Sequence, residues 1–315
     1  MKKPVTTIVT IPDMIMSDDW QSLSKKSDVT YIERDKVTED ELLDIVAESD
    51  YLMLNRDVVD ELTGYFYEQI KERTLPLKAI STDITGMSWA APEPAKKHGI
   101  LLMNTPNYST VSVAEFSLTI LLMLIKKLNL VYQDRLAGKE EIPYKNDVLT
   151  GKTVGIVGLG HIGTKFAELL QGFGVKIIAW DRKEKNVPNV TQLSLEDVME
   201  QSDYLSIHLK TTDETIGLFD AKLLTHAKVG QYIINEADGV LVDNDALLVA
   251  LNSGRVGGYA GSNSAVAGTP LAKHKNVITF PSQAWFTDHL LNLLRQIWVS
   301  NIISTIDGKP SNKVD

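Results

Sequence analysis

Short runs of β-branched and other apolar residues alternate with segments of helical periodicity along the chain. In the first third the pattern predicts amphipathic helices over 39–48 and 65–73, each lying between two apolar runs. Strands that alternate regularly with helices are typical of an α/β fold with a mainly parallel sheet. The strands expected in this part are 5–10, 29–32, 51–54, 77–81 and 101–103.

A second α/β series begins at Lys152, after a turn at Asn104-Thr105-Pro106-Asn107. Its expected strands are 153–157, 175–180, 204–209, 231–235, 256–260 and 277–279, and a final helix is expected over 288–307. A chain of 315 residues is long enough for two domains, each with its own core. We therefore predict an α/β protein with two doubly wound parallel sheets.

The segment 113–128 has helical periodicity but is apolar nearly all round. A helix of this kind needs cover on every side. Either the rest of the chain supplies that cover, as for an ordinary core helix, or a second subunit does. The sequence leaves both explanations open.

Composition and charge exclude several classes of function. The apolar fraction of 43% is that of a globular protein, and the net charge of −9 argues against a nucleic-acid partner. The chain has no cysteine, which excludes disulfides, thiolate catalysis and thiolate metal sites, and we expect no metal. The N-terminus does not resemble a signal peptide, and the longest apolar run, 118–125, is too short to cross a membrane. We expect no membrane partner and a cytoplasmic location.

The strongest chemical signal is a glycine-rich turn between an apolar strand and a helix. Thr153-Val154-Gly155-Ile156-Val157 leads into Gly158-Leu159-Gly160-His161-Ile162-Gly163, and helical periodicity follows. In G-x-G-x-x-G the first glycine permits a tight turn, the second lets the backbone approach a pyrophosphate, and the third lets helix and strand pack closely. The pyrophosphate would bind the free N–H groups at the helix N-terminus. The motif predicts a dinucleotide site.

Asp181 ends the next expected strand, about where an acidic residue binds the adenosine ribose hydroxyls. A carboxylate there repels a 2′-phosphate, so the sequence favours NAD over NADP. Arg182 follows directly and could weaken that preference.

At this point the sequence resembles the D-2-hydroxyacid dehydrogenase family over nearly its whole length. The cues include Met103-Asn104-Thr105-Pro106, Val113-Ala114-Glu115, Ser206-Ile207-His208-Leu209, Gly239-Val240-Leu241-Val242-Asp243 and Ser253-Gly254-Arg255-Val256-Gly257-Gly258. The resemblance implies a Rossmann NAD domain, 104–287, inserted into a flavodoxin-like substrate domain, 1–103 plus 288–315. It also implies a homodimer that uses the helix matching 113–128.

The resemblance fails at the three residues on which the family's chemistry relies. The position of the substrate-clamping arginine holds Asp238, within Asn235-Glu236-Ala237-Asp238-Gly239, and the position of the acid–base histidine holds Ser282. The glutamate that tunes the histidine should fall within 262–270, which has no acidic residue, at about Ala267. Reversing the charge removes a bidentate carboxylate clamp, and serine cannot replace histidine as an acid–base group by itself. Ordinary keto-acid reduction is therefore not expected.

Further candidates follow from the same alignment. His208, Glu236 and Ala237 fall beside the cofactor, with a wall role for His208, and a solvated acidic loop is the alternative for Glu236 and Asp238. Residues on the substrate side are Arg56, for which a surface ion pair is the alternative, Trp89 and Tyr108. His289 could be offered as the missing acid, although it begins the last helix, where a capping or solvent-facing role is more common.

Two functions from different classes remain. One is an NAD-dependent oxidoreductase with altered chemistry, whose acidic site would suit a neutral or cationic small molecule such as an aldehyde, alcohol, amine or imine. The other is an NAD-binding regulatory or sensor protein that has lost catalysis. A non-redox enzyme that uses NAD transiently is a third possibility. Oxidation of NADH by a supplied compound separates the first from the second.

Overall fold

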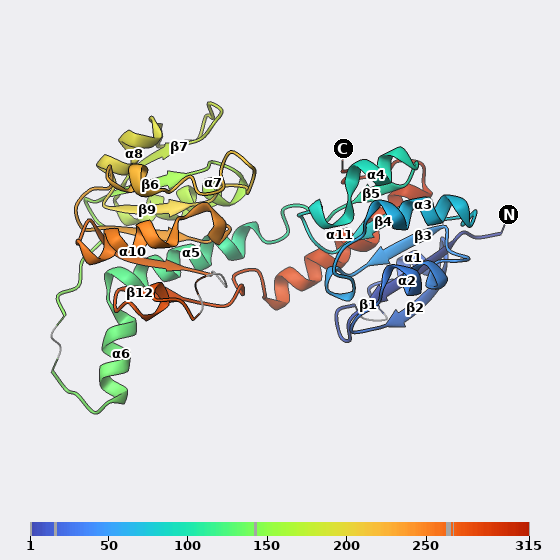
Figure 1. Cartoon of the computed structure of the whole chain (residues 1–315), viewed down its shortest axis with the longest axis horizontal. Helices are drawn as coiled ribbons and strands as arrows, with labels where there is room; N and C mark the ends of the chain where they lie inside the picture. The colour runs from blue at the N-terminus through green and yellow to red at the C-terminus, as the bar shows by residue number, and fades with distance from the viewer. Residues whose placement is uncertain (1, 16–17, 142–143, 263–265, 267, 315) are drawn as a thin grey trace. The chain divides into compact units, whose positions relative to one another are not determined.

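The computed structural model describes residues 2–15, 18–141, 144–262, 266 and 268–314. The chain divides into two compact units, one formed by Met1–Tyr108 with Thr287–Asp315 and the other by Ser109–Phe286. In Figure 1 the chain is coloured from blue at the N-terminus to red at the C-terminus, and the red C-terminal helix lies in the same unit as the blue N-terminal strands. The first unit continues to Tyr108, beyond the boundary at Met103 expected from the sequence.

The first unit is built on a parallel five-stranded sheet with the order β2-β1-β3-β4-β5. This is the flavodoxin-like strand order. The strands are β1 (Val5–Thr10), β2 (Asp28–Glu33), β3 (Tyr51–Leu54), β4 (Ala79–Thr82) and β5 (Leu101–Met103). The helices are α1 (Gln21–Ser24), α2 (Glu39–Ile45), α3 (Gly64–Glu72), α4 (Pro92–Lys97) and α11 (Asp288–Ile306).

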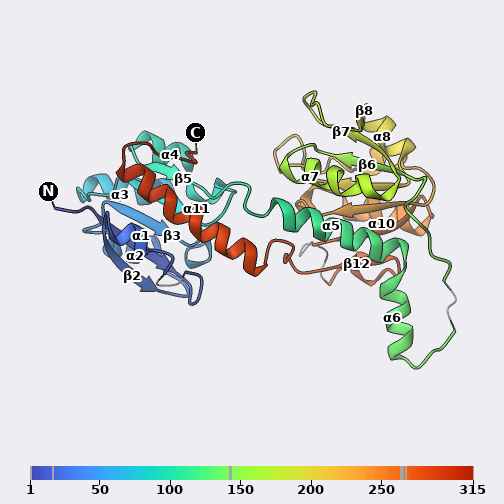
Figure 2. The same ribbon diagram turned by 180° about the vertical axis from the view of Figure 1, so that it is seen from behind.

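Helix α11 belongs to this unit because its apolar side chains pack on the sheet. Figure 2 shows α11 crossing over β3 and β4, and Leu294, Trp298 and Ile302 are buried there with Met53. The indole Nε1–H of Trp298 donates to the carbonyl of Ser81 at 2.9 Å, which satisfies the one polar atom of a fully buried side chain. The last helix of the chain thus completes the core begun by the first strands.

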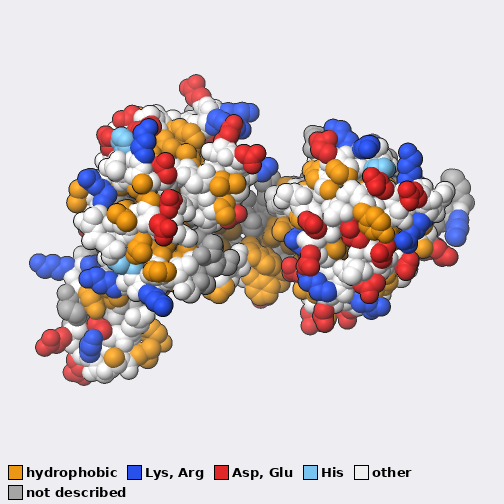
Figure 3. All heavy atoms as spheres, in the orientation of Figure 1, with side chains coloured by type: hydrophobic (Ala, Val, Ile, Leu, Met, Phe, Trp, Pro, Cys, Tyr) orange, Lys and Arg blue, Asp and Glu red, His pale blue; other side chains and the backbone are white. Residues whose placement is uncertain are grey.

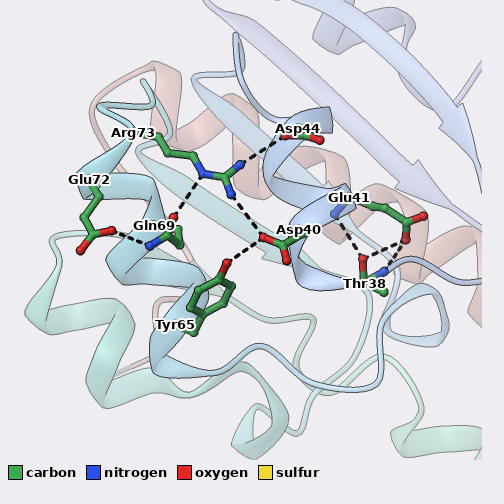
Figure 4. A network of polar contacts seen from close by, with 8 residues as sticks. All are labelled: Thr38, Asp40, Glu41, Asp44, Tyr65, Gln69, Glu72 and Arg73. Atoms are coloured by element: carbon green, nitrogen blue, oxygen red, sulfur yellow. Dashed lines mark hydrogen bonds and ion pairs between the residues drawn. The ribbon is translucent and has the colours of Figure 1, made fainter.

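On the outer side of the same unit, a polar network joins α2 to α3 (Figure 4). Arg73 donates to Asp40 and Asp44, each at 3.2 Å, and the hydroxyl of Tyr65 donates to Asp40 at 2.8 Å. Thr38 caps the start of α2 in a reciprocal capping box. The pairs are solvent-exposed, so the network orients the two helices and adds little stability.

The second unit carries a parallel seven-stranded sheet with the order β12-β11-β10-β9-β6-β7-β8. The order of its central strands is that of a Rossmann fold. The switch point, where the chain begins to add strands on the other side of β6, lies between β6 and β9. The strands are β6 (Thr153–Val157), β7 (Lys176–Trp180), β8 (Val190–Gln192), β9 (Tyr204–Ile207), β10 (Gln231–Asn235), β11 (Val256–Gly261) and β12 (Val277–Thr279). The helices are α5 (Thr110–Ile125), α6 (Leu128–Leu136), α7 (His161–Leu170), α8 (Leu195–Gln201), α9 (Ala221–Leu224) and α10 (Asn244–Asn252).

The apolar segment expected as one helix over 113–128 is two helices. Helix α5 ends at Ile125, Lys127 takes a left-handed backbone conformation with φ 51°, and Leu128 begins α6. Helix α5 packs on α7, β10 and β11, so its own chain supplies most of its cover. The chain's own packing accounts for the buried residues of α5, while Phe116, Leu118, Leu122 and Met123 stay partly exposed.

Helix α6 has no buried residue and extends away from the sheet of its unit (Figures 1 and 2). Leu128, Tyr132 and Leu136 are 49%, 66% and 71% exposed, and their i, i+4, i+8 spacing puts them on one face. Figure 3 shows apolar side chains on the surface of the region that α6 occupies in Figure 1. We call Leu128, Tyr132 and Leu136 the α6 stripe.

Among the helices that the structure describes, none is long and apolar enough to cross a membrane.

Candidate cofactor site and active centre

The central strands of the seven-stranded sheet end on one level. Val157 of β6 lies opposite Trp180 of β7 and Ile207 of β9, while Asn235 of β10 lies opposite Ile207 and Gly261 of β11. Neighbouring strands are about 4.8 Å apart. The residues that follow these ends therefore form a row along one edge of the sheet, in the order Asp181, Gly158, His208, Glu236 and Ser262. In open α/β sheets this edge, at the switch point, is where ligands bind.

Two glycines of the turn are required by close contacts. Gly158 has φ +100°, and a Cβ there would lie 2.7 Å from the carbonyl oxygen of His208. At Gly163, in the first turn of α7, a Cβ would lie 2.0 Å from the carbonyl oxygen of Gly158. At Gly160 a Cβ would meet no atom within 4 Å. The open side of Gly160 is the space that the motif reserves for a pyrophosphate.

A pocket with a volume of about 430 Å³ opens beside this turn. Five predicted residues line it: Gly158, Gly160, Asp181, Arg182 and His208. His161, Ile162 and Gly163 do not line it, because they form the first turn of α7, where backbone N–H groups are free. The other wall is the loop after β9, which sequence reasoning missed and which contributes Leu209, Lys210, Thr212, Glu214, Thr215 and Leu218.

Asp181 is held in place by backbone donors. Its Oδ2 accepts the N–H of Leu159 at 2.8 Å, and its Oδ1 accepts the N–H of Lys183 at 3.0 Å. Lys185 lies 3.6 Å from Oδ2 and donates to the carbonyl of Leu159 at 2.9 Å. The carboxylate is therefore fixed between the glycine turn and the strand end, and it can still accept bonds from ribose hydroxyls.

His208 is a wall of the pocket and not an acid. Burial lowers the pKa of His208 to about 3, so the imidazole is neutral at physiological pH. Its Nε2 lies 2.8 Å from the hydroxyl of Ser206, and its ring packs against Phe166 at 5.3 Å between centroids. The strand expected to reach Leu209 ends at Ile207, because from His208 onwards the chain turns over Gly158.

Glu236 follows β10 and contacts the end of β11. Its Oε1 accepts the N–H of Ser262 at 2.9 Å. Within the described part of the chain, Oε2 and the hydroxyl of Ser262 are buried without a hydrogen-bond partner. Burial raises the pKa of Glu236 to about 7, although the hydrogen bond from the Ser262 N–H acts to lower it. The neighbouring Ala237 N–H donates to the side chain of Asn235 at 3.0 Å and holds the loop in shape.

Asp238 is exposed and caps the short helix Gly239–Leu241. Its Oδ1 accepts the N–H of Val240 at 3.2 Å, and its Oδ2 accepts the hydroxyl of Thr211 at 3.3 Å. Ser282 is also exposed, and its carbonyl accepts the indole N–H of Trp285 at 3.2 Å. Ala267 lies outside the described residues. His289 is exposed in the first turn of α11, which belongs to the other unit.

The candidates on the substrate side lie in the first unit. The guanidinium of Arg56 lies over the ring of Trp89 at 4.8 Å and donates to the carbonyl of Val59 at 2.5 Å. Asp83, which sequence reasoning missed, is buried at the end of β4 and accepts the N–H of Arg56 at 2.8 Å. Burial raises the pKa of Asp83 to about 6 and that of Tyr108 to about 12. The sequence pattern that could have pointed to Asp83 is a carboxylate directly after the end of a strand, at the edge where ligands bind in such sheets.

Comparison with known proteins decides the family. Residues 118–284 match the family model described as D-isomer specific 2-hydroxyacid dehydrogenase, NAD binding domain. The glyoxylate reductase of Thermofilum pendens is 32% identical over 79% of this chain and 77% of its own length. The chain belongs to the D-isomer specific 2-hydroxyacid dehydrogenase family. The D-lactate dehydrogenase of Streptococcus agalactiae is 29% identical over 82% of this chain and 84% of its own length.

Solved structures share the fold of the whole chain. D-2-hydroxyisocaproate dehydrogenase matches with a TM-score of 0.85 at 24% identity, covering 98% of this chain and 99% of its own. An acyclic imino acid reductase in complex with NADPH and D-Arg matches with a TM-score of 0.87 at 23% identity, covering 99% and 100%. The α/β fold with two doubly wound parallel sheets, predicted from the sequence, is confirmed. The second unit of this dehydrogenase-family protein contains its NAD-binding domain.

Proposed function

We propose that this protein is an NAD-dependent oxidoreductase that acts on the carbonyl or imine group of a neutral or cationic small molecule and not on a simple 2-keto acid. NADH supplies the hydride when it is bound. The proposal keeps the cofactor chemistry of the family and changes the charge of the group that the site accepts.

The observation that supports this proposal is the acidic loop after β10. Glu236 and Asp238 both lie in it, and the resemblance puts Asp238 at the position of the family's substrate-clamping arginine. Asp238 is exposed, and its carboxylate oxygens accept hydrogen bonds from the Val240 N–H at 3.2 Å and from the Thr211 hydroxyl at 3.3 Å. Such a loop repels a substrate carboxylate and attracts a cation. The acyclic imino acid reductase with the same fold, in complex with NADPH and D-Arg, makes C=N reduction compatible with the architecture.

Among Glu236, Ser282 and His208, Glu236 has the pKa best suited to moving the proton. Ser282 has no pKa near neutrality and His208 is held neutral, so neither provides a proton at physiological pH. Glu236 carries a proton below about pH 7, and its Oε2 lacks a partner among the described residues. In the reduction of a carbonyl, the carboxyl O–H would donate to the forming alkoxide. With a protonated imine, the carboxylate would instead stabilise the cation.

The test is a screen of the purified protein with NADH against three groups of compounds: neutral aldehydes, cyclic imines and 2-keto acids. We expect oxidation of NADH with neutral aldehydes or cyclic imines such as 1-pyrroline, and none above background with pyruvate or glyoxylate. Carbonyl reduction should slow as the pH rises through about 7, because Glu236 then loses its proton. Glu236→Gln should lower that rate about 100-fold and flatten the pH profile.

The control for the Glu236 variant is Glu196→Gln, an exposed residue of α8, which should retain the rate and the pH profile of the unmodified protein. Both variants should bind NADH normally in calorimetric titrations. If the protein binds NADH but oxidises it with no compound of any group, the regulatory or sensor function replaces this proposal.

We also propose that the protein is a homodimer, and that the interface includes the α6 stripe as well as the partly exposed side of α5. Light scattering at micromolar concentration should give the mass of two chains. Tyr132→Asp with Leu136→Asp should give one chain, because two charges in an apolar interface are costly. Val249→Asp, at a position of α10 that is 69% exposed, is the control and should stay dimeric. A monomeric unmodified protein would contradict this interface.

The cytoplasmic location stays a prediction from the sequence.

A further inference from the structure

An ion pair crosses the mouth of the cofactor pocket. Arg182 Nη1 lies 3.1 Å from Glu214 Oε2, and both residues line the pocket. Arg182 follows β7, and Glu214 is in the loop after β9. In the sheet, β6 lies between these two strands. The pair therefore spans the end of β6, above the glycine turn where Gly158 and Gly160 line the same pocket.

Two ion pairs lie around the ribose end of the pocket, whose lining also includes Lys210. Lys185 is the partner of Asp181, at 3.6 Å, and also donates to the Leu159 carbonyl. Arg182 is the partner of Glu214. These pairs matter for the choice between NAD and NADP, because the charge of Asp181 alone does not determine which cofactor binds more tightly. Lys185 offsets the carboxylate that would repel a 2′-phosphate, and a guanidinium next to the ribose position would bind that phosphate well.

We propose that Glu214 determines the preference for NAD by holding Arg182 away from the position of the 2′-phosphate. In this arrangement Arg182 is a latent phosphate-binding group. Glu214 accepts a hydrogen bond from Nη1 of Arg182 and adds a negative charge of its own on the far wall of the pocket. NADP must then displace Glu214 from Arg182 and accept its repulsion, whereas NAD, which has only hydroxyls there, meets neither cost. The inference concerns cofactor binding alone and is independent of the substrate proposed above.

Exposure sets the size of the effect. The side chains of Arg182 and Glu214 are 73% and 75% exposed, so the pair itself contributes little to the stability of the fold. Removing Glu214 should therefore leave the protein folded. The gain for NADPH on removing Glu214 is the cost of breaking this exposed pair plus the repulsion between Glu214 and the 2′-phosphate. Together these correspond to about a tenfold change in affinity, or about 1.4 kcal/mol.

The experiment is a double-mutant cycle on the full chain, with NADH and NADPH affinities measured by calorimetric titration. The unmodified protein should bind NADH more tightly than NADPH. Glu214→Gln should raise the affinity for NADPH about tenfold and change that for NADH by less than about threefold. Arg182→Gln should weaken NADPH binding. In the Arg182→Gln background, Glu214→Gln should give no gain.

A control variant separates this role from a general effect of charge. Glu196→Gln removes the same charge from α8, a position that does not line the pocket, and should change neither affinity. The gain with Glu214→Gln should also shrink as salt is raised, because exposed charges are screened. Equal changes for both cofactors, no gain for NADPH, or the same gain without Arg182 would each overturn the proposal.

Discussion

Gly163→Ala should strongly destabilise the second unit, whereas Gly160→Ala should leave it folded and impair only cofactor binding. At Gly163 the new methyl group would lie 2.0 Å from the carbonyl oxygen of Gly158, a backbone atom that moves only with the turn. Overpacking of this kind costs about 3 kcal/mol or more. The melting temperature of the unit should fall by roughly 5–10 °C.

At Gly160 the same methyl group meets no atom within 4 Å, and the backbone is in an extended conformation with φ −69° and ψ −168°. The methyl group instead fills the space through which a pyrophosphate approaches the backbone. We expect an unchanged melting temperature and at least a tenfold loss of NADH affinity. Circular dichroism during heating and calorimetric titration measure the two effects separately. Equal melting temperatures for the two variants, or normal NADH binding by Gly160→Ala, would show that the turn does not work as argued.

The strands were predictable where a local pattern alone decides them. Six strands have the predicted limits, because each is a short run rich in β-branched or other apolar residues: Val5–Thr10, Tyr51–Leu54, Leu101–Met103, Thr153–Val157, Gln231–Asn235 and Val277–Thr279. Strand β8 was missed because its sequence, Val190-Thr191-Gln192, contains a single apolar residue. The break after α5 was missed as well. It depends on a left-handed Lys127, and no glycine or proline marks it in the sequence.

The site divides in the same way. The glycine turn could be predicted because the spacing G-x-G-x-x-G between an apolar strand and a helix is a local sequence pattern. Glu214 could not, since its role comes from an ion pair whose members the fold brings together. Arg182 and Glu214 are 32 residues apart in the chain, and only the strand order β9-β6-β7 puts them on opposite walls of one pocket. Sequence therefore predicts the cofactor site, and tertiary structure is needed for its selectivity.

Pyruvate and glyoxylate should be turned over negligibly by the unmodified protein, and this is the largest effect we expect. The resemblance puts Asp238 at the position of the clamping arginine and Ser282 at that of the acid–base histidine. Loss of the clamp and of the acid–base group removes two contributions to the rate, each commonly worth a few orders of magnitude. Together they should put keto-acid reduction below ordinary detection. Steady-state assays of NADH oxidation with both keto acids measure it.

The double substitution Asp238→Arg with Ser282→His tests the same argument in the other direction. Both side chains are exposed in the second unit, so larger replacements should fold. Asp238→Arg also loses the cap on Gly239–Leu241, which costs about 1 kcal/mol. Asp238→Asn keeps a capping side chain without the charge and is the matched control. We expect keto-acid binding to strengthen only with the arginine, and NADH oxidation to rise only when the histidine is added. Reduction of pyruvate or glyoxylate by the unmodified protein, at rates typical of dehydrogenases, would show that the active-site alignment behind these substitutions is wrong.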